Sequence, residues 1–183
     1  MIFFLYCSIL CWTFLEATFW WVAPDISIGI AFIYFPQYWR RFIIIGILGS
    51  LLGTLTTFFW ARELPIDWLA YVKTMPFHTL HNINFVNKTI NDPLTIIIGA
   101  WSGIPYKLFV GIGAIGGVAL TKFIIVGLLS RFIRFSFVLG VTSVIRYYTK
   151  SFSAQYPARM ALILMLIWIT AIGLFDIGIN RLV

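Results

Sequence analysis

Six charged residues lie within or beside apolar runs of the chain, and their chemistry needs a structural explanation. They are Glu16, Asp25, Lys107, Lys122, Arg131 and Arg134. A charge at the centre of a membrane helix costs about 2.5–3.5 kcal/mol, so each group needs a partner, water or a route to the interface. Lys122 is best placed to reach the interface with its long side chain. The others are candidates for a buried polar site.

Arg131 and Arg134 are three residues apart and therefore share one face of a helix. Two guanidinium groups on one face cannot pair with each other, but they suit a phosphate or two carboxylates. Lys107 follows Pro105 in a broken apolar segment and is a third candidate ligand for an anion. The alternative for all three is that they extend to the membrane interface.

Glu16 and Asp25 lie in the stretch LEATFWWVAPD and are nine residues apart. On one continuous helix, nine residues turn about 900°, which would place the two carboxylates on opposite faces. A fold-back at Pro24 removes this conflict and lets both carboxylates face one cavity, with Asp25 near the start of the next helix. The alternatives are a structural ion pair or a protonated buried acid for Glu16, and helix capping alone for Asp25.

The composition predicts an integral membrane protein. Of 183 residues, 61% are hydrophobic and 10% are charged, whereas a soluble domain has about 25% charged residues. The net charge of +7 is expected of loops that face anionic lipid on the cytoplasmic side. Nucleic-acid binding would need a solvated basic face, which the sequence does not offer. The first residues lack the basic region and cleavage site of a signal peptide, so none is expected.

The apolar runs differ in whether they can span a bilayer. Residues 42–61 and 160–180 are each long enough to cross about 30 Å of hydrocarbon as a helix. Residues 1–36 and 94–118 are each broken by proline, and their halves are too short to span. These broken segments predict re-entrant hairpins, and a long helix near 119–146 follows the second one.

The order of these segments predicts an all-α polytopic membrane protein with two inverted repeats. Each repeat is a re-entrant helical hairpin followed by a transmembrane helix, and a C-terminal transmembrane helix completes the fold. The single domain divides into a first repeat, a polar connecting loop, a second repeat and a C-terminal helix, at 1–61, 62–93, 94–146 and 147–183. The hairpin tips contain Pro24 and Pro105. Glycines that permit close helix packing are Gly49, Gly53, Gly113 and Gly117.

No motif of a nucleophilic, metal-dependent or nucleotide-dependent enzyme is found, so we expect neither enzymatic activity nor a cofactor. His78 and His81 are expected to be ordinary loop residues, because no third metal ligand accompanies them. Cys7 and Cys11 are expected to be small apolar residues of a packed stripe and not a disulfide framework.

The broken segments and the arginine pair resemble the DedA superfamily, also called the VTT or SNARE-associated Golgi protein family, and in particular its short YqaA-like branch. The matching residues are Glu16, Pro24-Asp25, Gly49-Ser50-Leu51-Leu52-Gly53, Ser102-Gly103-Ile104-Pro105-Tyr106-Lys107, Phe123 and Arg131-Phe132-Ile133-Arg134-Phe135. The resemblance covers about residues 13–140, and Thr54 and Phe132 stand where the family pattern has glycines. It implies opposed re-entrant hairpins in two inverted repeats.

The resemblance also implies movement of lipids between membrane leaflets, with dependence on proton motive force and on membrane-embedded acids. Under this hypothesis Lys107, Arg131 and Arg134 bind the phosphate of a phospholipid or polyprenyl phosphate. Glu16 and Asp25 neutralise these cations in the empty site and carry protons in the loaded one. The expected location is the bacterial inner (cytoplasmic) membrane, and a homodimer would help so short a chain to enclose a lipid path.

Two other functions stay open at this point. One is a proton- or cation-coupled transporter of a small solute, which would use the same buried charges. The other is a non-transporting membrane assembly factor, in which the buried charges pair only to stabilise the fold.

Overall fold

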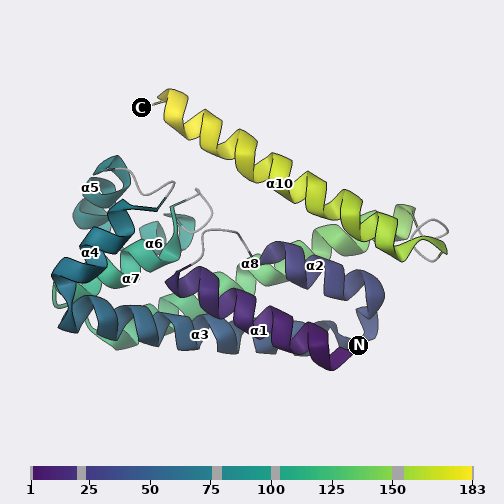
Figure 1. The fold of residues 1–183 in the computed structure, drawn as a ribbon, viewed down its shortest axis with the longest axis horizontal. Helices are drawn as coiled ribbons and strands as arrows, with labels where there is room; N and C mark the ends of the chain where they lie inside the picture. Colours follow the sequence, from purple (N-terminus) through teal and green to yellow (C-terminus); the bar gives the residue numbers. More distant parts are fainter. Residues whose placement is uncertain (1, 20–23, 76–79, 100–103, 150–154, 183) are drawn as a thin grey trace.

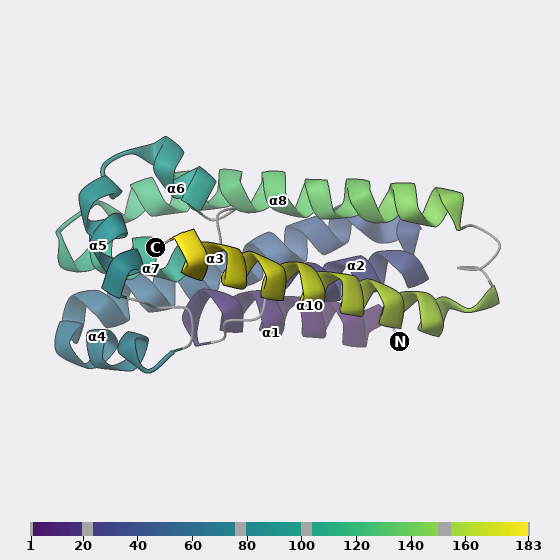
Figure 2. The same cartoon turned by 90° about the horizontal axis from the view of Figure 1, so that it is seen from above.

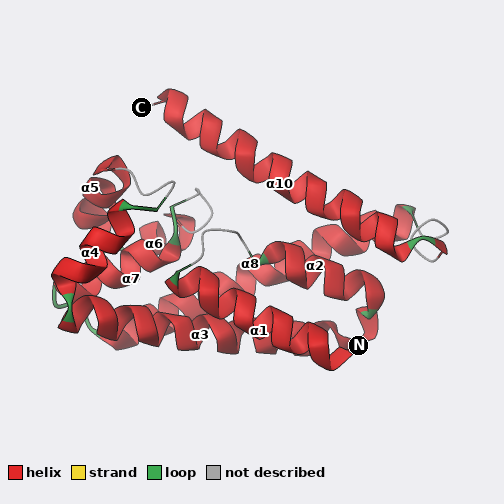
Figure 3. Cartoon of the chain, viewed as in Figure 1, coloured by secondary structure: helices red, strands yellow, loops and turns green. Residues whose placement is uncertain are grey.

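The computed structural model is helical throughout the part of the chain that it describes (Figures 1 and 3). That part comprises residues 2–19, 24–75, 80–99, 104–149 and 155–182. Two long antiparallel helices, α3 (Trp39–Glu63) and α8 (Leu120–Tyr148), extend along most of the molecule. Both are long and apolar enough to cross a membrane, which agrees with the low charge of the chain.

The first broken segment forms two shorter helices, α1 (Ile2–Thr18) and α2 (Asp25–Tyr34). Helix α1 runs parallel to α3 and ends beside its last third, where the Thr57 hydroxyl donates to the carbonyl of Ala17, and α2 then returns toward the end at which α1 began (Figure 1). A short 3-10 turn, η1 (Pro36–Tyr38), joins α2 to α3. The predicted break before Asp25 is therefore present as a change of helix.

The second broken segment forms α6 (Pro93–Gly99) and α7 (Tyr106–Ile115) at the opposite end of the molecule (Figures 1 and 2). Pro105 is extended, with φ −60° and ψ 129°, so the chain enters α7 from a non-helical residue. Gly117 has a φ of 76° after α7, a conformation that favours glycine, and it lets the chain turn into α8.

The stretch 62–93 differs from the polar loop that we expected, because much of it folds into α4 (Pro65–Lys73) and α5 (Leu80–Thr89). Helix α4 starts with a proline at its first position and carries Asp67 in its first turn and Lys73 in its last, which suits the helix dipole. Scattered apolar residues in this polar stretch, among them Trp68, are buried against α7.

The C-terminal stretch forms α10 (Pro157–Leu182), which packs on α2. Leu164 lies beside Gly29, where a side chain on the glycine would meet it at 3.4 Å. A helix over the predicted span 160–180 is thus present. Side chains are described only for part of α10, and Asp176 lies outside that part.

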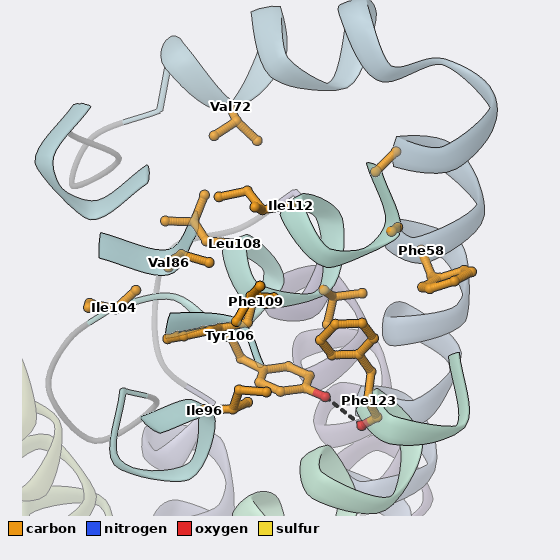
Figure 4. Packing of buried hydrophobic residues seen from close by; sticks show 14 of the residues in the cluster. Phe58, Val72, Val86, Ile96, Ile104, Tyr106, Leu108, Phe109, Ile112 and Phe123 are labelled. Carbon is orange, nitrogen blue, oxygen red and sulfur yellow. Dashed lines mark hydrogen bonds between the residues drawn. The ribbon is translucent and has the colours of Figure 1, made fainter. Parts of the chain in front are cut away.

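Two apolar cores lie at opposite ends of the bundle. One joins the end of α3 to α4, α5, α7 and the start of α8 (Figure 4). The other joins α1, α2, the start of α3 and the second half of α8. On α8, Phe123 and Val126 belong to the first core, and Phe135 and Leu139 belong to the second. The part of α8 between these two cores carries both arginines, near the middle of the molecule. We call the buried charged and hydroxyl-bearing side chains at this level the polar layer.

Candidate functional site

The polar layer contains a buried ion pair between α1 and α8. Nη2 of Arg131 donates to Oε2 of Glu16 at 2.5 Å. The two side chains are 3% and 11% exposed, so solvent screens the pair little. Glu16 faces the core because it follows the buried residues Ile9 and Thr13 at helical spacing.

A second ion pair joins α2 to α8 one turn away. Nε of Arg134 donates to both carboxylate oxygens of Asp25, at 3.1 and 3.0 Å, and Nη2 of Arg134 donates to Oδ2. The Asp25 side chain is fully buried, and Arg134 retains 21% exposure. Because Asp25 is the first residue of α2, its carboxylate also lies at the positive end of that helix dipole.

Both arginines therefore bind carboxylates from the first broken segment, one on α1 and one on α2. The fold-back between α1 and α2 brings Glu16 and Asp25 to one face of α8, as the sequence predicted from the conflict in their spacing. Arg131 and Arg134 share that face, three residues apart, and each takes one acid. Glu16 forms an ion pair, which was one of the alternatives considered for it. Asp25 also forms an ion pair, so helix capping alone does not explain its position.

Lys107 and Tyr106 bring α7 to the same layer. Lys107 is 2% exposed although it is a lysine in an apolar helix, so its side chain is buried within the protein. The Tyr106 ring lies against Arg131, with 5.5 Å between the guanidinium carbon and the ring centroid. Its hydroxyl donates to the carbonyl of Phe123 at 2.6 Å (Figure 4). Tyr106 thus fixes α7 to α8 and covers one side of Arg131.

Two further residues of the layer were not among the predicted site residues. Ser50 of α3 and Ser130 of α8 are buried, and neither hydroxyl has a hydrogen-bond partner among the described residues. The same holds for Nε and Nη1 of Arg131, whose remaining nitrogen binds Glu16. The sequence does not distinguish these serines, because serine is common in membrane helices. Ser50 was noted only as part of a glycine-rich motif, and nothing in the sequence indicated that either hydroxyl would be buried without a partner.

The predicted packing glycines divide into three that permit close contact and one that does not. A Cβ on Gly49 would collide with the Leu10 carbonyl and the Thr13 hydroxyl of α1, and one on Gly53 would collide with Ala17. A Cβ on Gly113 would collide with the ring of Phe123. Gly117 meets nothing within 4 Å and serves the turn after α7, so helix packing does not explain that glycine.

The other candidate residues lie outside the layer. Lys122 donates to the carbonyls of Ile90 and Asn91 at 3.1 and 2.9 Å, which agrees with a side chain that reaches a helix end. The prediction that Cys7 and Cys11 belong to a packed stripe is wrong, because both are exposed on α1. Cys11 lines an apolar groove of about 250 Å³ with Ser8, Trp12 and Leu15. His78 lies outside the described residues, as does the side chain of His81, and no group of metal ligands is found among those described.

Comparison with known proteins identifies no relative of the chain, since no family model, curated protein or solved structure matches it.

Proposed function

We propose that the chain is a membrane lipid transporter of the DedA type, which moves a phosphate-bearing lipid between leaflets. The observation that carries this proposal is the state of Arg131. Its guanidinium is buried, one nitrogen holds Glu16, and Nε and Nη1 have no acceptor among the described residues. A buried guanidinium with donors in reserve is suited to a phosphate oxygen.

The arrangement of the helices supports two inverted repeats with opposed re-entrant hairpins. In the first hairpin, α1 packs on α3 of its own half, and α2 packs on α8 of the other half and on α10. In the second hairpin, α6 packs on α8 of its own half and α7 packs mainly on α3 of the other half. The two hairpins enter from opposite ends (Figure 1), as expected of transporters with a central site.

The charges of the layer favour an anionic substrate. Three cations, Lys107, Arg131 and Arg134, stand against two acids, Glu16 and Asp25, which leaves one positive charge when all five are ionised. A phosphodiester carries one negative charge and would balance the layer. Protonation of Glu16 would release Arg131 toward the lipid phosphate, which provides a route to proton coupling.

The test is lipid movement in proteoliposomes, followed with a fluorescent phospholipid and an impermeant quencher. We expect rapid loss of inner-leaflet fluorescence with the wild type and little with Glu16→Gln. Glu63→Gln is the matched control, because Glu63 makes the same chemical change at an exposed position at the end of α3. Equal rates for the wild type and Glu16→Gln would contradict the proposal.

A structural role for the charges makes a different prediction. In a non-transporting assembly factor, the exchanged pair Glu16→Arg with Arg131→Glu should restore function, because the pair alone matters. In a transporter the exchanged pair should stay inactive, because Arg131 would no longer lie beside Tyr106 and Lys107. Ion flux without lipid movement would instead indicate a solute carrier. The resemblance favours a bacterial inner membrane as the location and leaves a homodimer possible.

A further inference from the structure

Most buried hydroxyl groups of the described residues donate to a backbone carbonyl, whereas those of Tyr6, Ser50 and Ser130 have no partner there. Tyr6 packs on Phe42, about two turns of α3 before Ser50, and so lies away from Arg131. Thr13, Thr18, Thr54 and Thr142 each donate to a carbonyl one turn earlier in their own helix, the usual arrangement for such side chains in an apolar interior. Ser50 and Ser130 do not, although each sits in a regular helix where a carbonyl one turn back is within reach. Their oxygens are therefore available to something other than the backbone.

The two serines lie at the same depth as Arg131. Helices α3 and α8 are antiparallel, and two contacts fix their register: Gly46 lies against the ring of Phe135, and the rings of Phe58 and Phe123 are 6.2 Å apart. One turn from Gly46 along α3 is Ser50, and one turn from Phe135 in the same direction along α8 is Arg131. Ser130 precedes Arg131 directly.

We infer that Ser50, Ser130 and the free N–H groups of Arg131 form one oxyanion site that binds a phosphate group. Nε and Nη1 of Arg131 supply three N–H donors, and each serine supplies one O–H. These five donors come from two helices, which suits a tetrahedral phosphate better than a planar carboxylate. An unpaired buried donor is costly, so a bound phosphate would remove a penalty that the empty site carries.

This inference deepens the proposed function and rests on it for the source of the phosphate. It assigns the serines to substrate binding, whereas the acids and cations alone account for charge. A lipid headgroup and a free phosphate share the same chemistry at this site. The experiment must therefore distinguish the two sources.

The experiment measures thermal unfolding of the purified full chain in detergent micelles with three probes. The probes are a short-chain phosphatidylglycerol, the diacylglycerol with the same acyl chains, and inorganic phosphate. A ligand that binds the folded state raises Tm with its concentration. We expect phosphatidylglycerol, and not diacylglycerol, to raise the Tm of the wild type. A response to inorganic phosphate as well would identify free phosphate as a sufficient ligand.

Ser50→Ala and Ser130→Ala test the assignment of the hydroxyls. Each should require about tenfold more phosphatidylglycerol for the same rise in Tm, since a hydrogen bond to a charged group is lost. Thr142→Val is the control, because it removes a buried hydroxyl that already has a backbone partner. The rise in Tm is compared within each variant, so a lower starting stability does not affect the result.

Two results would overturn the inference: an equal response to phosphatidylglycerol in both serine variants and the wild type, or an equal response of the wild type to diacylglycerol. The outcomes remain separate from those of the transport test. Phosphate binding that depends on the serines, without lipid movement, would keep the site and reject transport. Lipid movement that depends on Glu16, without a serine effect, would keep transport and reject the oxyanion site.

Discussion

Arg134 of α8 binds Asp25 of α2 through both Nε and Nη2, at the residue where α2 begins. The pair therefore does more than neutralise two charges. It fixes the start of α2, the second helix of the first broken segment, to the centre of a helix of membrane-spanning length. The planar guanidinium makes this contact specific, because a lysine offers no such fork.

Replacement of Arg134 should therefore destabilise the protein by an amount that depends on whether Asp25 keeps a cationic partner. Arg134→Gln leaves the Asp25 carboxylate buried without a cation and should lower the free energy of unfolding by about 3 kcal/mol. Arg134→Lys should lose less, since it keeps the charge. Denaturant unfolding in micelles measures both, with Arg40→Lys as a control at an exposed arginine. Arg134→Gln as stable as the wild type would show that Asp25 has another partner.

Replacement of two glycines by alanine should have opposite effects on stability, because one lies at the contact between α1 and α3 and the other faces open space. Gly49→Ala should cost about 1–3 kcal/mol, because the new Cβ meets a backbone carbonyl of α1 that cannot rotate away. Gly140→Ala should be neutral or stabilising by up to about 1 kcal/mol, because nothing lies within 4 Å and alanine favours a helix. Unfolding of the two variants under the same conditions tests this, and equal costs would contradict it.

Asp92 predicts a pH-dependent contribution at the start of α6. Its Oδ2 accepts from the Thr95 hydroxyl at 2.5 Å and its Oδ1 from the Leu94 amide at 3.0 Å, and these bonds lower the pKa of the carboxyl. The stabilisation is therefore complete above the ordinary pKa of about 4 and is lost as pH falls through the lowered value. The difference in Tm between the wild type and Asp92→Ala should be constant above about pH 5 and shrink below it.

Thr95→Val provides the control for the sign of this effect. It removes the bond that lowers the pKa of Asp92 most, so the remaining contribution of Asp92 should disappear at a higher pH than in the wild type. A loss at the same pH in both proteins would mean that the Thr95 bond does not hold the carboxylate in its charged form.

The two cysteines of α1 test whether the exposed face of the bundle contacts lipid. Both are exposed, and a charged reagent does not enter the hydrocarbon of a membrane. In intact membranes we expect neither Cys7 nor Cys11 to react with a charged, impermeant maleimide, and both to react after denaturation in SDS. Glu63→Cys, at the exposed end of α3, should react in membranes and serves as the positive control. Labelling of Cys11 before denaturation would contradict the prediction, because it would show that water reaches the groove beside Cys11.

The sequence sufficed for those parts of the site that follow from helix geometry. The shared face of Arg131 and Arg134 follows from a spacing of three, and the break before Asp25 follows from proline and from the conflict between the two acids. The pairing itself did not follow: which arginine takes which acid depends on the register of α1 and α2 against α8. That register is set by packing, such as the approach of Thr142 of α8 to Gly29 of α2, and not by any local pattern.

Two other features were beyond the sequence for different reasons. The stretch 62–93 is polar on average, and its helices are stabilised by single buried residues such as Trp68, which an average conceals. The unpaired hydroxyls of Ser50 and Ser130 depend on side-chain orientation. The amino-acid sequence alone does not distinguish a serine that donates to its own helix from one that points into the interior.

Helix α4 contacts both α7 and the residue that follows α1, and this contact has a consequence for the stability of both helices. Trp68 occupies the space that a side chain on Gly111 of α7 would need, and the Tyr71 hydroxyl donates to the carbonyl of Phe19, just after α1, at 3.0 Å. One short helix thus contacts both the helix that carries Lys107 and the residue that follows the helix that carries Glu16. A binder that displaced α4 would therefore loosen both helices at once without touching a charged residue of the polar layer.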